Sequence, residues 1–325
     1  MRVRQVVPRD AIPSVDDPVF GPDHAGAPDD ELIVVDVSPP RGYPVRFLHY
    51  HEIVNDRLDR TIDTADGGRT DAIAVTWCPL CGSAVVYDRV VDGRVLTFGV
   101  SGKLADDDLV MYDRETGSEW RQSTGVCIAG SLEGERLGVL PSGLTTWEHF
   151  RESSPAGVVL QPPGGESEAS GPGDDPREIT YDTDPYEAYF DAEGFGLGAH
   201  RGTGGRQWDR GDLDPKAVVV GLAFDEEAVG VPVRAVEDAG GALTLRVGGR
   251  GVVVFVSLSG PHAFENPGFE FEAAGEGRFR GDGTTWDPAT GEGADGRRLD
   301  RLPVRRLFAF AWQDDHGPDA FYEGE

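Results

Sequence analysis

Two cysteines separated by two residues carry the clearest chemistry in this sequence. Cys78 and Cys81, in the stretch Trp77-Cys78-Pro79-Leu80-Cys81-Gly82-Ser83, are two of only three cysteines in 325 residues. Thiols at this spacing can both bind one metal ion, or can form a disulfide with each other. Thioredoxin-type enzymes place such a pair at a helix N-terminus, but here Gly82-Ser83 and a predicted strand follow. The context therefore favours a metal-binding or nucleophilic role over thiol redox chemistry.

Nitrogen and oxygen donors lie upstream of the thiols, in His49-Tyr50-His51-Glu52. In a strand His49 and His51 would share a face, and in a helix they would not. We predict that Cys78, Cys81, His51 and His49 bind a thiophilic metal, with copper or zinc favoured over iron. Glu52 is then an outer carboxylate or a proton carrier.

Two other functions stay open for the same residues. In the first, an enzyme uses Cys78 as its nucleophile or redox thiol, with His51 as base and Glu52 beside it. In the second, the thiols only pack inside a non-catalytic binding or assembly module. The expected partner is a small molecule or a metal ion.

Other motifs predict less chemistry. Cys127, in an apolar run, is expected to be a packed small residue. Asp106-Asp107-Asp108 lacks the spaced oxygen donors of a calcium loop, so we expect a solvated turn. The glycine clusters at 194–198 and 202–205 lack any phosphate-loop pattern and predict flexible connections.

Composition restricts the partners and the location. Acidic residues outnumber basic ones 58 to 30, for a net charge of −28, and Lys103 and Lys216 are the only lysines. Such a surface repels nucleic acid and is typical of proteins adapted to molar salt, where charge repulsion is screened. The N-terminus has no secretory signal pattern and the apolar runs are too short to span a membrane, so we expect a cytoplasmic protein.

The pattern of turns predicts a mainly β fold, or β-rich α+β, with few short helices. Asp92-Gly93 predicts a hairpin between strands at 84–91 and 94–100, with the thiols at its entrance. We expect helices at 145–152 and 308–313. We expect an extended arm over 1–30, a β-rich unit over 31–160, a linker over 161–177 and a second β-rich unit over 178–325.

The two units share a sequence motif around a tryptophan, which predicts an internal duplication. The first copy of this motif is Gly117-Ser118-Glu119-Trp120, and the second is Gly283-Thr284-Thr285-Trp286. In each unit the motif is followed by a Thr-Gly pair, an Arg-Leu pair and a proline. In this alignment the thiols face Arg246 and Gly249, so the second unit lacks the site.

Several longer motifs resemble domain-of-unknown-function family 3179. They are His51-Glu52-Ile53-Val54-Asn55-Asp56, Cys78-Pro79-Leu80-Cys81-Gly82-Ser83-Ala84, and Leu109-Val110-Met111-Tyr112-Asp113-Arg114-Glu115-Thr116-Gly117-Ser118. The resemblance covers 30–160 strongly and the second unit more loosely. It implies a member of haloarchaeal type and brings no activity or cofactor. It implies only a site location, at His51, Glu52, Cys78, Cys81 and Gln122.

Overall fold

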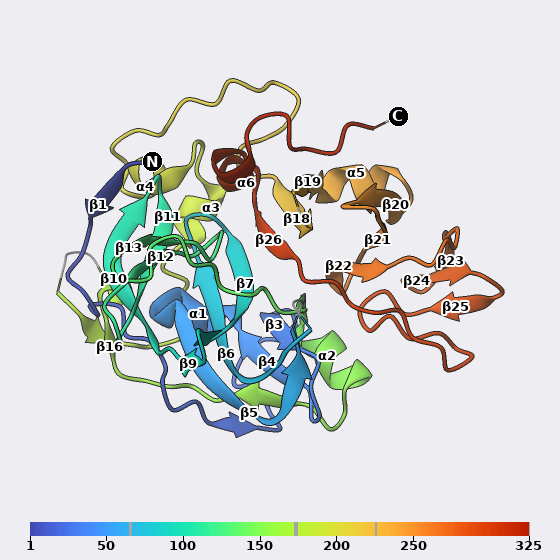
Figure 1. Ribbon diagram of the computed structural model, residues 1–325, viewed down its shortest axis with the longest axis horizontal. Coiled ribbons are helices and arrows are strands. Elements are labelled where there is room, and N and C mark those ends of the chain that lie inside the picture. Colours follow the sequence, from blue (N-terminus) through green and yellow to red (C-terminus); the bar gives the residue numbers. More distant parts are fainter. Residues whose placement is uncertain (65–66, 172–174, 225, 325) are drawn as a thin grey trace.

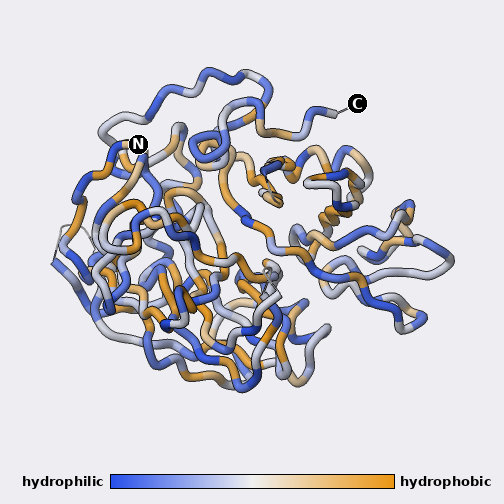
Figure 2. Tube along the Cα trace, viewed as in Figure 1, coloured by the Kyte–Doolittle hydropathy of each residue, from blue (hydrophilic) through white to orange (hydrophobic). Residues whose placement is uncertain are grey.

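Short strands and tight turns make up most of the chain, which confirms the expected mainly β class. The computed structural model describes residues 1–64, 67–171, 175–224 and 226–324. Figure 1 shows a larger body built mostly from the first half and a smaller one built from the second. Apolar segments gather inside the larger body, and hydrophilic ones occupy its outer loops (Figure 2).

A six-stranded sheet joins the two halves. Its strands, in spatial order, are β19 (Glu227–Pro232), β18 (Val218–Phe224), β26 (Arg305–Phe308), β7 (Ser83–Asp88), β6 (Arg69–Cys78) and β5 (Ile53–Asp63). The first three strands come from the second half and the last three from the first. The two halves are therefore not separate sheets beside each other.

Strand β6 is buried on both faces, and its side chains alternate between two apolar cores. Ile73, Val75 and Trp77 belong to one core, whereas Ala74 and Cys78 belong to the other. The two residues at the end of β6, Trp77 and Cys78, therefore point to opposite sides of the sheet.

Two five-stranded sheets cover these cores. The core of Cys78 lies against β1 (Val3–Gln5), β10 (Phe98–Ala105), β11 (Asp108–Asp113), β12 (Glu119–Arg121) and β13 (Cys127–Ala129). The core of Trp77 lies against β14 (Gly143–Thr146), β3 (Glu31–Val35), β4 (Arg41–Pro44), β15 (Val158–Leu160) and β2 (Phe20–Gly21).

The remaining described elements are short. The strands are β8 (Val90–Val91), β9 (Arg94–Val95), β16 (Glu166–Ser167), β17 (Arg177–Glu178), β20 (Ala242–Val247), β21 (Arg250–Ser257), β22 (Gly260–Glu265), β23 (Glu272–Gly275), β24 (Arg278–Gly281) and β25 (Thr284–Trp286). The helices are α1 (Val45–His51), η1 (Glu168–Ser170), α2 (Trp147–Ser153), α3 (Glu187–Asp191), α4 (Gly196–His200), α5 (Val233–Asp238) and α6 (Ala309–His316). No helix among the described residues is long and apolar enough to span a membrane.

The turn at Asp92-Gly93 forms as predicted, but its hairpin is small. Asp92 and Gly93 both have positive φ, and only β8 and β9 pair across them. The longer strands β7 and β10 belong to different sheets. The prediction that the thiols sit at the entrance of this hairpin was wrong, because they lie in the turn of the preceding hairpin, β6–β7.

The N-terminal segment and the region after β15 both lie against the first half. Strand β1 pairs with β10, and Val15 forms a bridge with Val54, so the expected arm is bound along its length. In the expected linker, Ser167 is buried and donates a hydrogen bond to Tyr50 O. Residues 172–174 of that linker lie outside the described residues, and the domain boundaries stay a prediction.

The two halves share an order of elements. In the first, β3 and β4 precede α1, and β14 returns beside β3 before α2. In the second, β18 and β19 precede α5, and β26 returns beside β18 before α6. The internal duplication itself stays a prediction.

This order of elements changes which turn of the second half corresponds to the β6–β7 turn, which carries the cysteines. Strands β5, β6 and β7 follow α1, just as β20, β21 and β22 follow α5. The β6–β7 turn therefore corresponds to the β21–β22 turn at Ser257–Gly260, instead of to Arg246 and Gly249 in the β20–β21 hairpin. The second half still has no thiol at this position.

Candidate metal centre

The turn between β6 and β7 carries both cysteines. Cys78 is the last residue of β6 and pairs with Ser83, the first residue of β7. Gly82 has a φ of +54°, a conformation that favours glycine. The Cys78 and Cys81 side chains are buried, and neither thiol is in a disulfide.

Strand β26 of the second half holds this turn in place. The Phe308 amide donates to Cys81 O at 2.7 Å, and Arg306 Nη1 donates to Gly82 O at 2.7 Å. These bonds fix the backbone that presents the thiols.

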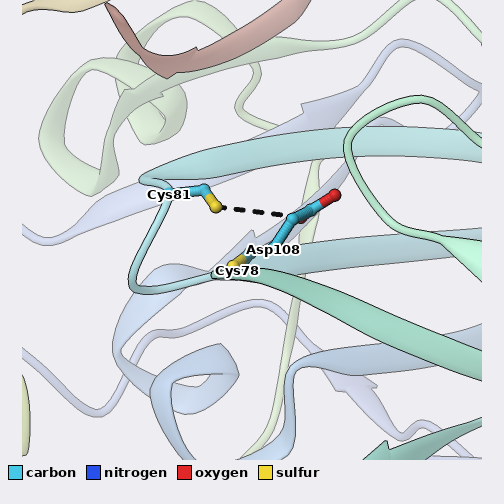
Figure 3. A group of neighbouring side chains, drawn as sticks. All are labelled: Cys78, Cys81 and Asp108. Atoms are coloured by element: carbon cyan, nitrogen blue, oxygen red, sulfur yellow. Dashed lines mark hydrogen bonds between the residues drawn. The ribbon is translucent and has the colours of Figure 1, made fainter. Parts of the chain in front are cut away.

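Asp108, the first residue of β11, completes a group of three buried donors. Cys78 Sγ, Cys81 Sγ and one Asp108 carboxylate oxygen all lie within 4.8 Å of one another. Cys81 Sγ is 3.8 Å from Asp108 Oδ1 and 3.5 Å from Asp107 O (Figure 3). The expected solvated turn at Asp106-Asp107-Asp108 was wrong for Asp107 and Asp108, because both are buried. Leu197 N donates to Asp107 Oδ1, and Cys81 lies beside Asp108.

The Asp108 carboxylate has one anchored oxygen. Oδ2 accepts from Arg121 Nε at 3.0 Å, from Ser123 N at 3.1 Å and from Ser123 Oγ at 2.7 Å. With Oδ2 held by these three donors, Oδ1 is left facing the thiols. This arrangement orients a ligand in the way that outer-shell hydrogen bonds orient metal-bound carboxylates.

Arg121 also connects the site to the second half. Its Nη2 lies 2.8 Å from Asp315 Oδ1 in α6. Burial raises the pKa of Asp315 to about 7, and Arg121 opposes that shift. A buried ionic network of Asp108, Arg121 and Asp315 thus connects the two halves.

Burial also makes the thiol of Cys81 hard to ionise. Desolvation raises its pKa well above the ordinary value, and the nearby Cys78 and Asp108 add to the shift. Arg121 already balances the charge of the Asp108 carboxylate. Two thiolates in the same buried site would need a further positive charge beside them. A bound cation would supply that charge and would deprotonate the thiols that coordinate it.

The geometry suits a tetrahedral metal ion. With a Zn–S distance of about 2.3 Å, two sulfurs on one zinc ion are roughly 3.8 Å apart. Donor atoms within 4.8 Å of one another can reach that separation by small rotations of the side chains. Three protein ligands leave one coordination position open.

A cavity of about 90 Å³ lies beside Cys78 and not beside Cys81. Besides apolar side chains, its walls include Glu52, Glu168, Tyr186 and His200. The ring of His200 stacks on Tyr186, with centroids 5.0 Å apart, and burial lowers the pKa of His200. Cys78 is therefore the thiol that faces open space.

Glu52 reaches this cavity from the end of α1. It is buried, its φ is +58°, and Oε2 has no hydrogen-bond partner among the described residues. Burial, followed by repulsion from Glu168, raises the pKa of Glu52 to about 8. A protonated carboxyl group at neutral pH fits the predicted role of a proton carrier.

The structure does not bring His51 into the donor group. Residues 45–51 form α1, so His49 and His51 do not share a face as they would in a strand. His51 Nδ1 lies 2.9 Å from Pro13 O, and Nε2 lies 2.6 Å from Tyr181 OH. Both ring nitrogens therefore already have partners.

His49 also lies apart from the thiols. Its Nδ1 is 3.0 Å from Asp184 Oδ1, and its ring lies near those of Trp77, Tyr186 and Phe190. It lines a different cavity from the one beside Cys78.

Gln122 stabilises the β6–β7 hairpin, which carries the cysteines, through hydrogen bonds to both of its strands. Its Nε2 donates to Thr76 Oγ1 at 2.8 Å and to Ser83 O at 3.3 Å, while Oε1 has no partner among the described residues. It holds the β6–β7 hairpin and is not one of the three grouped donors.

Sequence reasoning missed Asp108, Arg121 and Asp315 at the donor group, and Tyr186 and His200 at the cavity. The three charged residues are inconspicuous among 58 acidic residues and many arginines. One signal was available, because Lys103, one of only two lysines, also lines the cavity of Cys78.

A family model described as "Protein of unknown function (DUF3179)" matches residues 9–320. The chain has no significant match among the curated proteins. It has none among the solved structures either.

Proposed function

The chain belongs to the DUF3179 family, whose description gives no activity, and we infer its function from its own residues. We propose that it binds a thiophilic transition metal through Cys78, Cys81 and Asp108. His51 and His49, predicted as ligands from the sequence, are replaced in this proposal by the Asp108 carboxylate.

One observation supports the proposal above the others. Three ionisable donors of metal-binding type are buried together within 4.8 Å, and a third element, β12, orients the carboxylate through Arg121. If these three side chains only packed against one another, the site would not need an aspartate with one oxygen held by hydrogen bonds and the other directed at the thiols.

The donor set favours zinc over copper. Two thiolates alone suit Cu(I), but a carboxylate oxygen is a harder ligand that suits Zn²⁺ better. Zinc bound by three protein ligands would keep a position for water or substrate and would lower the pKa of that water. Glu52, which lines the cavity beside Cys78, is placed to accept or donate a proton there.

The test is the zinc content of purified protein after equilibration with Zn²⁺ and removal of the free ion. We expect about one zinc ion per chain, with binding at least tenfold weaker in Cys78→Ser, Cys81→Ser and Asp108→Asn, since each substitution removes one ligand. Cys127→Ser is the matched control, because Cys127 is buried but outside the donor group. Equal zinc affinity in Cys78→Ser and Cys127→Ser would reject the site.

A second candidate is thiol chemistry at Cys78. It is supported by the shared cavity, in which Glu52 takes the place that the sequence had given to His51 as base. In metal-free protein above about pH 8, where Glu52 is ionised, alkylation of Cys78 by iodoacetamide would then be faster than that of Cys81 and slower in Glu52→Gln. Equal reactivity of the two thiols would count against this candidate.

A further inference from the structure

The cavity beside Cys78 has mostly apolar walls, and we call it the Cys78 cavity. The N-terminal segment, the β6–β7 turn, the β10–β11 hairpin and α4 supply its aliphatic side chains, which include Val7, Ile12, Leu80, Val100, Leu109 and Leu197. Val7, Ile12, Leu80 and Leu197 each keep 5–9% of their surface exposed. Apolar surface in contact with water is unfavourable, and a ligand with an apolar body would cover it.

The volume of the Cys78 cavity limits the size of such a ligand. The cavity measures about 90 Å³, whereas an apolar cavity of about 150 Å³ engineered in another protein holds one benzene molecule. In proportion, the Cys78 cavity can enclose an apolar body of roughly four carbons. Cys78 itself keeps only 1% of its surface exposed. The part of the cavity next to the thiol therefore admits only a small group.

The charged side chains that line the Cys78 cavity balance one another. Two are acidic, Glu52 and Glu168, and two are basic, Lys103 and Arg201. Lys103 Nζ lies 2.6 Å from Glu119 Oε1, and Arg201 is exposed to solvent. The lining thus has no excess charge of either sign, and an ion that entered these apolar surroundings would lose its hydration. An uncharged ligand avoids that cost.

A metal ion in the proposed centre would not attract anions into the cavity. The two positive charges of Zn²⁺ are exceeded by the three negative charges of Cys78, Cys81 and Asp108 as ligands. Arg121, which lies 3.0 Å from Asp108 Oδ2, offsets the remaining negative charge. Asp315, on the other side of Arg121, can add only negative charge. The centre therefore has no excess positive charge.

Two polar atoms on the walls are available to the polar end of a ligand. Glu52 and Tyr186 each keep 7% of their surface exposed, and both line the cavity. The fully buried polar atoms without partners include Glu52 Oε2, but neither Glu52 Oε1 nor Tyr186 OH. Neither of these last two atoms forms a hydrogen bond with a described residue. His200 stacks on Tyr186 and is uncharged near neutral pH, because burial lowers its pKa.

We propose that the Cys78 cavity is the substrate site of the metal centre, and that the substrate is a small uncharged molecule with an apolar body and one oxygen-bearing end. The body would pack on Val7, Ile12 and Leu197, and the polar end would lie beside Cys78, within reach of the Tyr186 hydroxyl. This inference rests on the proposed metal site. Binding in the cavity can nevertheless be measured in metal-free protein.

The first experiment compares three probes that share an unbranched four-carbon chain and differ in charge: butanamide, butanoate and butylammonium. NMR titration of the metal-free whole chain gives the affinities, in about 1 M KCl, where the Debye length of about 3 Å screens long-range attraction. We expect butanamide to bind at least about tenfold more tightly than either ion, because each ion loses its hydration on entering. This comparison uses the wild type and does not depend on any variant.

A pair of variants tests whether butanamide binds in the Cys78 cavity. Val7→Phe adds a ring to the wall and should weaken butanamide binding at least about tenfold, because the cavity has little volume to spare. Val3→Phe is the matched control, since Val3 makes the same change in the same N-terminal segment but is 41% exposed and lies outside the cavity. Val3→Phe should bind butanamide as the wild type does.

Cobalt(II) in place of zinc tests the link to the metal centre. Absorption from the thiolate–cobalt bonds shows that the ion is bound, and the visible bands report changes in its coordination. We expect butanamide to shift the visible bands of the wild type and of Val3→Phe, and to have little effect on Val7→Phe. Thiolate–cobalt absorption in all three proteins also shows that the variants have folded around the site.

The outcomes separate this inference from the proposed function. If no thiolate–cobalt absorption develops, the proposed metal site fails and the inference fails with it. If cobalt binds but butanamide leaves the visible bands unchanged, the metal site stands and its assignment to this cavity is overturned. Equal affinity for the three probes, or equal butanamide affinity in Val7→Phe and Val3→Phe, also overturns the inference.

Discussion

Glu52 combines two features that each cost free energy. A positive φ is unfavourable for a residue with a Cβ, and a buried carboxyl oxygen that has no partner in the described part of the chain loses its hydration. At the corresponding end of α5 the chain has Gly240, with a φ of +87°, which carries neither cost. Unfavourable conformations of this kind gather at functional sites, and Glu52 lines the cavity beside Cys78.

The raised pKa of Glu52 predicts that stability falls as pH rises. The carboxyl is protonated in both states below its ordinary pKa of 4.5, and the folded state keeps the proton up to about pH 8. Between these values the unfolded state loses its proton first, so the free energy of unfolding decreases. Glu52→Gln should therefore match the metal-free wild type near pH 4 and exceed it by roughly 2–4 kcal/mol near pH 8. Urea unfolding of metal-free protein at both pH values measures this.

Glu52→Gly separates the effect of backbone strain on stability from the effect of the carboxyl charge. It should be more stable than Glu52→Gln by about 0.5–1 kcal/mol at both pH values, because glycine adopts positive φ without strain. A pH dependence of Glu52→Gln equal to that of the wild type would show that Glu52 is not the group responsible.

Residue spacing predicted only the local part of the site. Cys78 and Cys81 are close in the chain, so their meeting needed only a turn. Asp108 reaches them from another sheet, through the pairing of β10 and β11 and the packing of the shared core. No local pattern marks that aspartate, and the positive φ of Glu52 leaves no trace in the sequence.

At the scale of elements, the β6–β7 turn depends on a close approach by β26. A Cβ added at Gly82 would lie 2.8 Å from the ring of Phe308 and 2.9 Å from Arg306 Nη1. Positive φ and the lack of space therefore both require glycine here. The turn that carries the thiols is in this way shaped by the second half of the chain.

Gly82→Ala should be much more disruptive than Gly93→Ala. Both glycines have positive φ, but nothing lies within 4 Å of a Cβ at Gly93. We expect Gly93→Ala to cost about 1 kcal/mol from the backbone alone, and Gly82→Ala to cost about 1–3 kcal/mol more from overpacking. Unfolding curves of the two variants provide the comparison. Similar losses in both would mean that β26 does not press on the turn.

The elements themselves were predictable to different degrees. The helices expected at 145–152 and 308–313 form as α2 and α6. The sequence does not distinguish a helix from a strand at α1, because His49-Tyr50-His51 fits either period over so short a stretch. The pairing of β26 with β7 joins residues more than 200 positions apart, and such a contact cannot be inferred from local periodicity.

At the scale of the whole molecule, the net charge of −28 contributes an unfavourable electrostatic term to stability. Exposed carboxylates repel one another, and salt reduces this repulsion by shortening the Debye length from about 10 Å at 0.1 M to about 3 Å at 1 M. Most of the ion pairs among the described residues involve exposed side chains, which contribute little individually.

Stability should therefore rise with KCl concentration. The urea midpoint at neutral pH should be higher at about 1 M than at about 0.1 M KCl, since screening favours the compact state. Near pH 4.5, the isoelectric point of the sequence, the same comparison should give a much smaller difference. A salt effect of equal size at both pH values would point to a cause other than charge repulsion.

The place of β26 between β18 and β7 has a consequence for shortened versions of the chain. A fragment ending before residue 305 would leave β7 with an unprotected edge whose amides and carbonyls could recruit another molecule. It would also free the backbone of Cys81 and Gly82 from its two outside supports. The second half, which lacks thiols, thus covers the edge of β7 against self-association and also holds the backbone of the cysteine turn in place.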